Sequence, residues 1–475
     1  MNRYLYTILL IAFSVSETKA QMMNTAPKLV VNITIDQLRS DYIEAFSALY
    51  TNDGFKKLFT DGKVFENASY SFVNIDRASA IATLSTGSNP YYHGIVGQQW
   101  MNKNTLQPVS CTDDSKNGAS PANIQVSTLG DEIKVSTEGK AVVFSIAKDC
   151  DASILTAGHA ADGALWLNGN LWTTSTYFSK NIPNWVKTQN EINITNSVQF
   201  KDNQSTNTAI TDMALQCIRC NAMGTDNATD LLNITYSAEN EAKEKITQWQ
   251  SNLQKTYVSL DRTLAQLIGS IEKMLGKQNV LFVLTSTGYS KDEDITLYSK
   301  YKVPTGIFYI NRTSNLLNMY LGAIYGQGRY VETCFHNQIF LNQKLIEQKR
   351  MNMVDVLKRS QAFLMQISGV RDVYTSDMLL TTRSNDLEKV RNGYDANKNG
   401  DIIVEIAPGW QLKNENNLEN YTQRATFVPF PIIFYGNNAK AQRIVTPAKV
   451  ERIAPTIAKC IRIRAPNACF EAPLF

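Results

Sequence analysis

Two charged residues occupy positions at which an α/β protein places its chemistry. Asp36 directly follows the apolar run of residues 29–35, which predicts a buried strand. Ligands of open α/β sheets bind at the carboxyl ends of such strands. Arg77 opens a helix of small residues that ends before Gly87. A helix N-terminus favours an anion or a nucleophile over a cation, so we expect an acidic group to face Arg77.

Metal-ligating side chains are scarce in this chain. A binuclear zinc site needs several imidazole and carboxylate donors, and the only histidines are His93, His159 and His336. We expect each of them to be a structural hydrogen-bonding residue. Residues 395–401 have the alternating oxygen side chains of an EF-hand loop, but the twelfth position is Ile406 rather than an acid. This stretch therefore predicts a glycine-containing turn that enters a strand.

The elements that would position Asp36 and Arg77 alternate between strands and helices. Further apolar runs at residues 141–146, 279–284 and 431–436 predict buried strands. Residues 242–277 carry apolar side chains three and four positions apart, which is typical of a helix packed on a sheet. Residues 290–400 predict a helix-rich insertion with short strands. The pattern predicts an α/β fold, a doubly wound, mostly parallel sheet flanked by helices, with this insertion.

The N-terminus predicts export from the cytoplasm. Residues 1–20 combine Arg3, an apolar run at 4–15 and the small residue Ala20, which is typical of a secretory signal peptide. Its removal takes away two basic residues and one acidic residue, so the formal charge of +4 falls to +3. A nearly neutral chain gives no electrostatic reason to expect nucleic acid or an anionic membrane as partner. We expect residues 21–475 to form a single domain, without a transmembrane segment, in a bacterial periplasm.

Several short motifs occur in an order that resembles a known family. They include IDQLR at residues 35–39, TGSNP at 86–90, HGIVG at 93–97, GHAAD at 158–162 and PGW at 408–410. Together they resemble the alkaline phosphatase superfamily, in particular the PafA-like bacterial periplasmic phosphatases and the related type I phosphodiesterases and nucleotide pyrophosphatases. The resemblance extends over nearly the whole mature chain and implies an alkaline-phosphatase-like fold.

The resemblance also implies what this chain has lost. Active members hold two zinc ions with three aspartates and three histidines, and a threonine or serine at the helix N-terminus attacks phosphate. Asp36 keeps the first aspartate, whereas Arg77 stands at the position of the nucleophile. Five further metal-ligand positions are degenerate: Asn240, Glu244, Ser286, Thr287 and a position near Asn420. Among the phosphate-contacting positions, an asparagine is replaced by Gln98, a lysine is kept as Lys148 and an arginine is replaced by Cys150.

These losses lead to three hypotheses. The first is a catalytically inactive pseudoenzyme without zinc or another cofactor, which acts by binding or scaffolding, possibly with an envelope protein; it predicts an Asp36–Arg77 salt bridge. The second is an active phosphate-ester hydrolase whose Ca²⁺ or Mg²⁺ is held by Asp36, Glu244, Asn240 and Asn420. The third is a non-hydrolytic receptor in which Arg77 and Lys148 bind an anion. Alternatively, these two cations only neutralise Asp36, Asp149 and Asp151.

Overall fold

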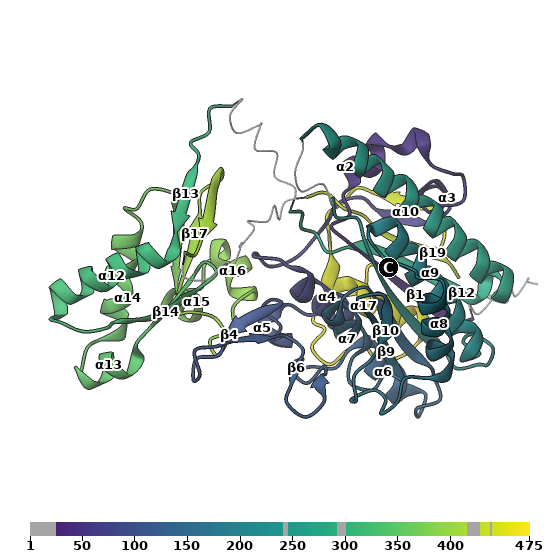
Figure 1. Ribbon diagram of the computed structural model, residues 1–475, viewed down its shortest axis with the longest axis horizontal. Coiled ribbons are helices and arrows are strands. Elements are labelled where there is room, and N and C mark those ends of the chain that lie inside the picture. Colours follow the sequence, from purple (N-terminus) through teal and green to yellow (C-terminus); the bar gives the residue numbers. More distant parts are fainter. Residues whose placement is uncertain (1–24, 241–245, 292–300, 416–427, 438) are drawn as a thin grey trace, which may run out of the picture.

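A nine-stranded sheet forms the centre of the larger lobe in the computed structural model, which describes residues 25–240, 246–291, 301–415, 428–437 and 439–475 (Figure 1). Its strand order is β10-β9-β8-β11-β1-β12-β19-β2-β20. β1 (Leu29–Asp36) lies between β11 (Asp230–Ser237) and β12 (Val280–Ser286) and is parallel to both. β8 (Val143–Ala147) and β9 (Gly163–Asn168) extend the parallel arrangement. The predicted mostly parallel α/β sheet is confirmed.

The edges of this sheet contain its antiparallel pairs. At one edge, β10 (Leu171–Thr173) is antiparallel to β9. Toward the other edge, β19 (Ile432–Gly436) is antiparallel to both β12 and β2 (Lys63–Phe65), and β2 pairs in parallel with β20 (Gln442–Ile444). The prediction that residues 431–436 form a buried strand is confirmed. This strand is antiparallel to its neighbours because the chain enters it from the insertion, at the opposite end of the sheet from β12 and β2.

Helices cover both faces of the sheet, as a doubly wound fold requires. One face packs against α3 (Phe55–Asp61), α8 (Asn184–Thr195), α9 (Asn203–Cys220) and the long α10 (Ile246–Leu275). The other face packs against α4 (Arg77–Thr86), α6 (Leu129–Ser136) and α17 (Ile453–Ile461). The apolar stripe of α10 is core, since Leu260, Leu264 and Leu267 are fully buried. α7 (Cys150–Ala157) lies beside α4.

A second lobe is built from residues 306–413 and lies to one side of the main sheet (Figure 1). Its four-stranded sheet has the order β14-β15-β17-β16 and its own hydrophobic core. A separate pair of parallel strands, β13 (Gly306–Tyr309) and β18 (Trp410–Lys413), stands where the chain enters and leaves the lobe. The other elements are β14 (Val331–Phe335), β15 (Gln338–Leu341), β16 (Val370–Thr375), β17 (Ile402–Ile406), α12 (Ile310–Tyr325), α13 (Gln343–Gln348), α14 (Met353–Leu364), α15 (Ser376–Thr381) and α16 (Glu388–Asn392).

The turn before β17 holds this second lobe against the first. Lys398 donates from Nζ to the carbonyl oxygen of Gly94, and its ammonium lies 4.5 Å from the centre of the Trp100 ring. Asp401 accepts hydrogen bonds from the amide of Leu341 at 2.8 Å and from Gln343 Nε2 at 3.0 Å. The predicted turn entering a strand is confirmed, and it contributes to the contact between the lobes.

Short elements complete the larger lobe. They are α2 (Ser40–Ala45), α5 (Pro90–His93), β3 (Ala68–Ser69), β4 (Gln99–Met101), β5 (Pro108–Ser110), β6 (Asp113–Asp114), β7 (Gly118–Ala119), β21 (Ala448–Lys449) and the 3₁₀ turns η1 (Ser47–Leu49), η2 (Lys277–Asn279) and η4 (Val450–Arg452), with η3 (Asn385–Leu387) in the second lobe. No helix within the described ranges is long and apolar enough to cross a membrane. The predicted signal peptide, residues 1–20, lies outside those ranges.

Candidate functional site

Helix α4 begins at Arg77 because Asp76 caps it. The Asp76 carboxylate accepts a hydrogen bond from the Ser79 amide at 2.9 Å, and the Ser79 hydroxyl lies 3.0 Å from the Asp76 amide in return. This reciprocal capping box satisfies two of the unpaired N–H groups at the helix start. The Ser79 hydroxyl is fully buried within the cap. It is therefore not placed to act as a nucleophile instead of residue 77.

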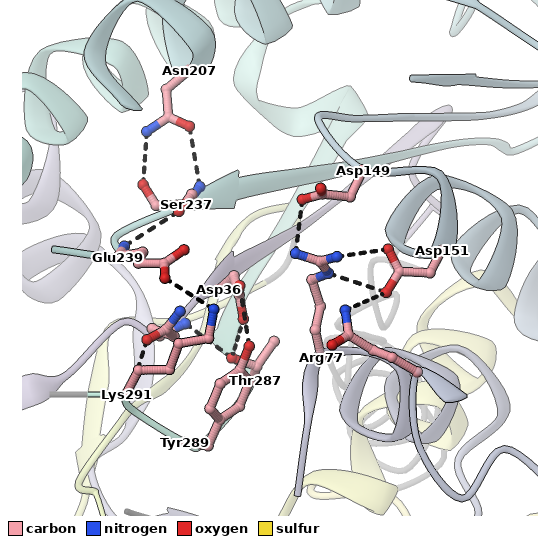
Figure 2. A network of polar contacts seen from close by, with 12 residues as sticks. Asp36, Arg77, Asp149, Asp151, Asn207, Ser237, Glu239, Thr287, Tyr289 and Lys291 are labelled. Carbon is pink, nitrogen blue, oxygen red and sulfur yellow. Dashed lines mark hydrogen bonds and ion pairs between the residues drawn. The ribbon is translucent and has the colours of Figure 1, made fainter. Parts of the chain in front are cut away.

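The Arg77 side chain reaches the start of the neighbouring helix α7, as Figure 2 shows. Its Nη1 lies 2.8 Å from Asp149 Oδ2, while Nε and Nη2 donate to the two oxygens of Asp151 at 3.2 and 2.9 Å. Gln98 Nε2 also donates to Asp151, at 3.0 Å. The predicted Asp36–Arg77 salt bridge is wrong, because two carboxylates at the start of α7 bind the guanidinium and Asp151 does so with both oxygens. Of the alternative in which Arg77 and Lys148 neutralise Asp36, Asp149 and Asp151, only the pairing of Arg77 with Asp149 and Asp151 is confirmed.

Asp36 finds its partners on the segment after β12 instead. Its Oδ1 accepts a hydrogen bond from the Thr287 hydroxyl at 2.8 Å, and the Tyr289 hydroxyl lies 3.3 Å from Oδ2. The Thr287 hydroxyl also accepts from the amide of Gln37 at 2.9 Å. β1 and β12 are parallel neighbours, so their carboxyl ends bring residues 36 and 287 together. Both carboxylate oxygens of Asp36 are thus satisfied by neutral hydroxyl groups.

The environments of the two aspartates shift their pKa values in opposite directions. Burial raises the pKa of Asp36, and the opposing effects of Arg77 and the Thr287 hydrogen bond do not cancel it. Burial also acts on Asp151, but the charge and hydrogen bonds of Arg77, with the bond from Gln98, hold the pKa of Asp151 below its usual value. The pKa of Arg77 rises because the attraction of Asp151 and Asp149 outweighs its burial. Arg77 therefore stays charged and Asp151 ionised.

A second ion pair lies beside Asp36 (Figure 2). Lys291 Nζ is 2.9 Å from Glu239 Oε1, and the Lys291 amide donates to Gln37 Oε1 at 3.0 Å. Glu239, Lys291 and Tyr289 were not predicted as site residues. Only their positions, a few residues after the carboxyl ends of β11 and β12, could have indicated them.

The remaining predicted residues that the structure describes have separate surroundings. Lys148 is exposed after β8 and has no ion-pair partner in the part of the chain that the structure describes. The Ser286 hydroxyl is buried and donates to the Leu38 carbonyl at 2.8 Å. Asn240 follows β11 at the margin of the described segment, while Glu244 and Asn420 lie outside the described residues.

His93 and His159 make structural hydrogen bonds, as predicted. His93 Nε2 lies 3.0 Å from the Thr83 hydroxyl, and burial, with the nearby charge of Lys398, lowers the pKa of His93 to about 3. His159 Nδ1 lies 2.9 Å from Asp131 Oδ2. His336 stacks on Phe335 in the second lobe. None of them belongs to the Asp36–Arg77 region.

The described residues around Asp36 do not supply the ligands that a zinc pair needs. Within the described ranges, no three His, Cys, Asp or Glu side chains cluster as metal ligands. The oxygens of Asp36 are bound by two hydroxyl groups, and Ser286 and Thr287 offer neutral hydroxyls where zinc prefers imidazole and carboxylate. The Arg77 guanidinium adds a fixed positive charge to the same region.

Comparison with known proteins places this fold in a family. The family model described as type I phosphodiesterase / nucleotide pyrophosphatase matches residues 30–426. The chain is 25% identical to alkaline phosphatase PafA of Elizabethkingia meningoseptica over 96% of this chain and 95% of that protein. It is 24% identical to alkaline phosphatase PhoV of Synechococcus elongatus, over 93% and 91% of the two chains.

Solved structures agree on the fold. The crystal structure of wild-type PafA superposes with a TM-score of 0.82 at 23% identity, and the match covers 94% of this chain and 98% of that one. Murine ectonucleotide pyrophosphatase/phosphodiesterase 5 superposes with a TM-score of 0.56 at 11% identity, over 92% and 95% of the two chains. The chain belongs to the type I phosphodiesterase / nucleotide pyrophosphatase family, as a PafA-like member of the alkaline phosphatase superfamily.

Proposed function

We propose that this protein is a catalytically inactive member of its family, which binds no zinc and acts by binding or scaffolding in the bacterial envelope. One observation carries the proposal. Arg77 stands at the first residue of α4, where the resemblance places the nucleophile, and its guanidinium is bound by Asp149 and Asp151. An arginine in this state has no lone pair with which to attack phosphorus.

The surroundings of Asp36 support the same proposal. A buried carboxylate without a partner is costly, and in a zinc enzyme the metal would balance its charge. Here the Thr287 and Tyr289 hydroxyls bind both carboxylate oxygens. The raised pKa of Asp36 lowers the cost of burial further, because it favours the neutral acid. The site is therefore stable without a cation.

Electrostatics also disfavour a metal here. A dication within about 5 Å of the Arg77 guanidinium would be repelled by several kcal/mol at an effective dielectric constant near 20. The anion-receptor hypothesis gains no support from the geometry either, because Arg77 already has two carboxylate partners and Lys148 is exposed. An incoming phosphate would have to displace Asp151 from a two-bonded ion pair.

Export belongs to this proposal too. The signal-peptide pattern of residues 1–20 and the bacterial alkaline phosphatases among the relatives support a periplasmic location.

Hydrolysis of aryl phosphates tests the proposal directly. The purified protein and its Asp36→Ala variant are assayed with 4-nitrophenyl phosphate and bis(4-nitrophenyl) phosphate, with and without added Zn²⁺, Ca²⁺ or Mg²⁺. A PafA preparation assayed in parallel is the positive control. We expect the same background rate from both chains under every condition. Turnover that Asp36→Ala abolishes would refute the proposal and favour the unorthodox hydrolase.

A further inference from the structure

Lys103 lines two cavities at the place where the turn between β4 and β5 meets the second lobe. The smaller cavity has a volume of about 310 Å³ and the larger one about 460 Å³. Apart from Lys103, every residue that lines the smaller cavity belongs to the second lobe. Pockets for small organic ligands usually have volumes of about 300–1,000 Å³. Both cavities are therefore of a size that suits such a ligand.

The Lys103 ammonium group borders both cavities. Its Nζ donates to the carbonyl oxygen of Ala396 at 2.7 Å, and Ala396 lines the smaller cavity. The same Nζ lies 5.9 Å from the centre of the Phe340 ring, which lines the larger cavity. An ammonium group has three N–H donors, and the described part of the chain gives this one a single hydrogen-bond acceptor. Because Lys103 is partly exposed, its remaining donors are available to a ligand.

The positive charge of Lys103 is incompletely balanced. Among the described residues, no carboxylate forms an ion pair with it; Asp401 lines both cavities, but its two oxygens accept hydrogen bonds from the Leu341 amide and from Gln343. Burial lowers the pKa of Lys103, and the attraction of Asp401 and Asp395 does not offset this effect. A partly buried cation in this state is stabilised by an anion that hydrogen-bonds it.

Much of the remaining wall of the smaller cavity is apolar. Ile346 lies on α13, Met351 and Met353 stand where α14 begins, and Leu380 lies on α15. Methionine side chains are flexible and adapt to the shape of what they contact. Leu380 is 58% exposed, so it offers its apolar surface to a ligand. Glu347 also lines this cavity, but it is exposed, and water and salt screen its charge.

We propose that the smaller cavity binds an organic anion, a carboxylate carried on an apolar body. The carboxylate accepts hydrogen bonds from Lys103 Nζ, and the body packs on Met351, Met353 and Leu380. Because Lys103 belongs to the larger lobe and the other lining residues to the second lobe, the ligand contacts both lobes. This inference is independent of whether the Asp36–Arg77 site is catalytic.

Ligand-observed NMR titrations of the full chain test the inference with three probes of one shape. 4-Phenylbutyrate is anionic, 4-phenylbutyramide is neutral and 4-phenylbutylamine is cationic. We expect saturable binding of 4-phenylbutyrate with a Kd on the order of 1 mM, and at least about fivefold weaker binding of the other two probes. No saturation by 4-phenylbutyrate at about ten times that concentration would overturn the proposal, as would equal affinity for all three probes.

Substitutions of the charged group locate the carboxylate. Lys103→Met should weaken 4-phenylbutyrate binding at least about fivefold, whereas Lys103→Arg keeps the charge and should bind within about twofold of the original chain. The matched control is Lys344→Met, which removes a positive charge from an exposed residue that lines only the larger cavity. It should bind like the original chain. Equal losses of affinity in Lys103→Met and Lys344→Met would contradict the assignment.

A substitution on the apolar wall tests the same site without removing the hydrogen bond to Ala396. Leu380→Asp places a negative charge at an exposed position of the wall, so the protein should remain folded. It should weaken 4-phenylbutyrate binding at least about fivefold, because apolar contact is lost and like charges repel. Undiminished affinity in a folded Leu380→Asp variant would overturn the proposal even if Lys103→Met fails to fold.

Discussion

Arg77 and Asp151 form an ion pair with two hydrogen bonds, from Nε at 3.2 Å and from Nη2 at 2.9 Å. Only 17% of the Arg77 side chain and 11% of the Asp151 side chain are exposed. The pair joins the first residue of α4 to the first turn of α7, so it links two helices that would otherwise present like partial charges to each other.

Replacing Arg77 should therefore destabilise the protein strongly. Arg77→Met leaves Asp151 buried without its cation and Asp149 without a partner, and the loss of one member of a buried pair costs about 3–5 kcal/mol. Urea denaturation measures the free energy of unfolding. The control is Arg359→Met, which breaks an exposed pair with Asp355 and should change the free energy of unfolding much less. Similar losses in the two variants would show that the Arg77 pair is not a structural one.

Asp36 should make stability fall as the pH rises. Its pKa is higher in the folded than in the unfolded chain, so the folded state holds its proton more tightly. The stabilisation that Asp36 provides is fully present below its pKa in the unfolded chain, which is near 4. This stabilisation is lost as the pH rises through the pKa of Asp36 in the folded chain. Asp36→Asn cannot ionise, so its stability relative to the original chain should increase over this window. A difference between the two chains that is constant with pH would contradict the raised pKa.

Asp151 should produce the opposite pH dependence. Arg77 holds its folded pKa below the unfolded value, so its contribution is present above about pH 4 and disappears as the pH falls through the folded pKa. Asp151→Asn should therefore have a lower free energy of unfolding than the original chain at neutral pH. Its free energy of unfolding should also decrease less as the pH falls into the acidic range. If the free energy of unfolding decreases equally steeply with falling pH in both chains, Asp151 does not form a charged pair with Arg77.

Lys398 should be needed to hold the second lobe in place. Lys398→Met removes the hydrogen bond to the Gly94 carbonyl and the contact with the Trp100 ring, which together contribute about 1–3 kcal/mol. We expect faster amide hydrogen exchange at residues 94–101 and 395–401, with little change in the core of the nine-stranded sheet. Lys344→Met, at an exposed position of the same lobe, is the control. Unchanged exchange in both variants would show that other contacts are sufficient.

The fold was predictable because its strands are fully buried and strongly apolar. β12 begins as an apolar run, β1 and β8 are buried throughout although they contain Asn32, Thr34 and Ser145, and the stripe of α10 has clear helical spacing. The antiparallel direction of β19 was not predictable, because local sequence does not record where the chain returns from an insertion.

The sequence predicted where the site residues stand in the fold but not which side chains bind one another. The sequence places Asp36 at a strand end and Arg77 at a helix start, and both positions hold. Which carboxylate meets the guanidinium depends on how α7 packs beside α4, a tertiary contact that spans about seventy residues. The same is true of Thr287 and Tyr289, whose hydroxyls meet Asp36 only because β1 and β12 are neighbours.

We propose that contacts within the chain have replaced the family's zinc pair. Zinc content by inductively coupled plasma mass spectrometry, after incubation with Zn²⁺ and extensive dialysis, measures this most directly. We predict far less than one zinc ion per chain, and the same amount in Asp36→Asn. Two zinc ions per chain that disappear in Asp36→Asn would show that this site binds the metal pair.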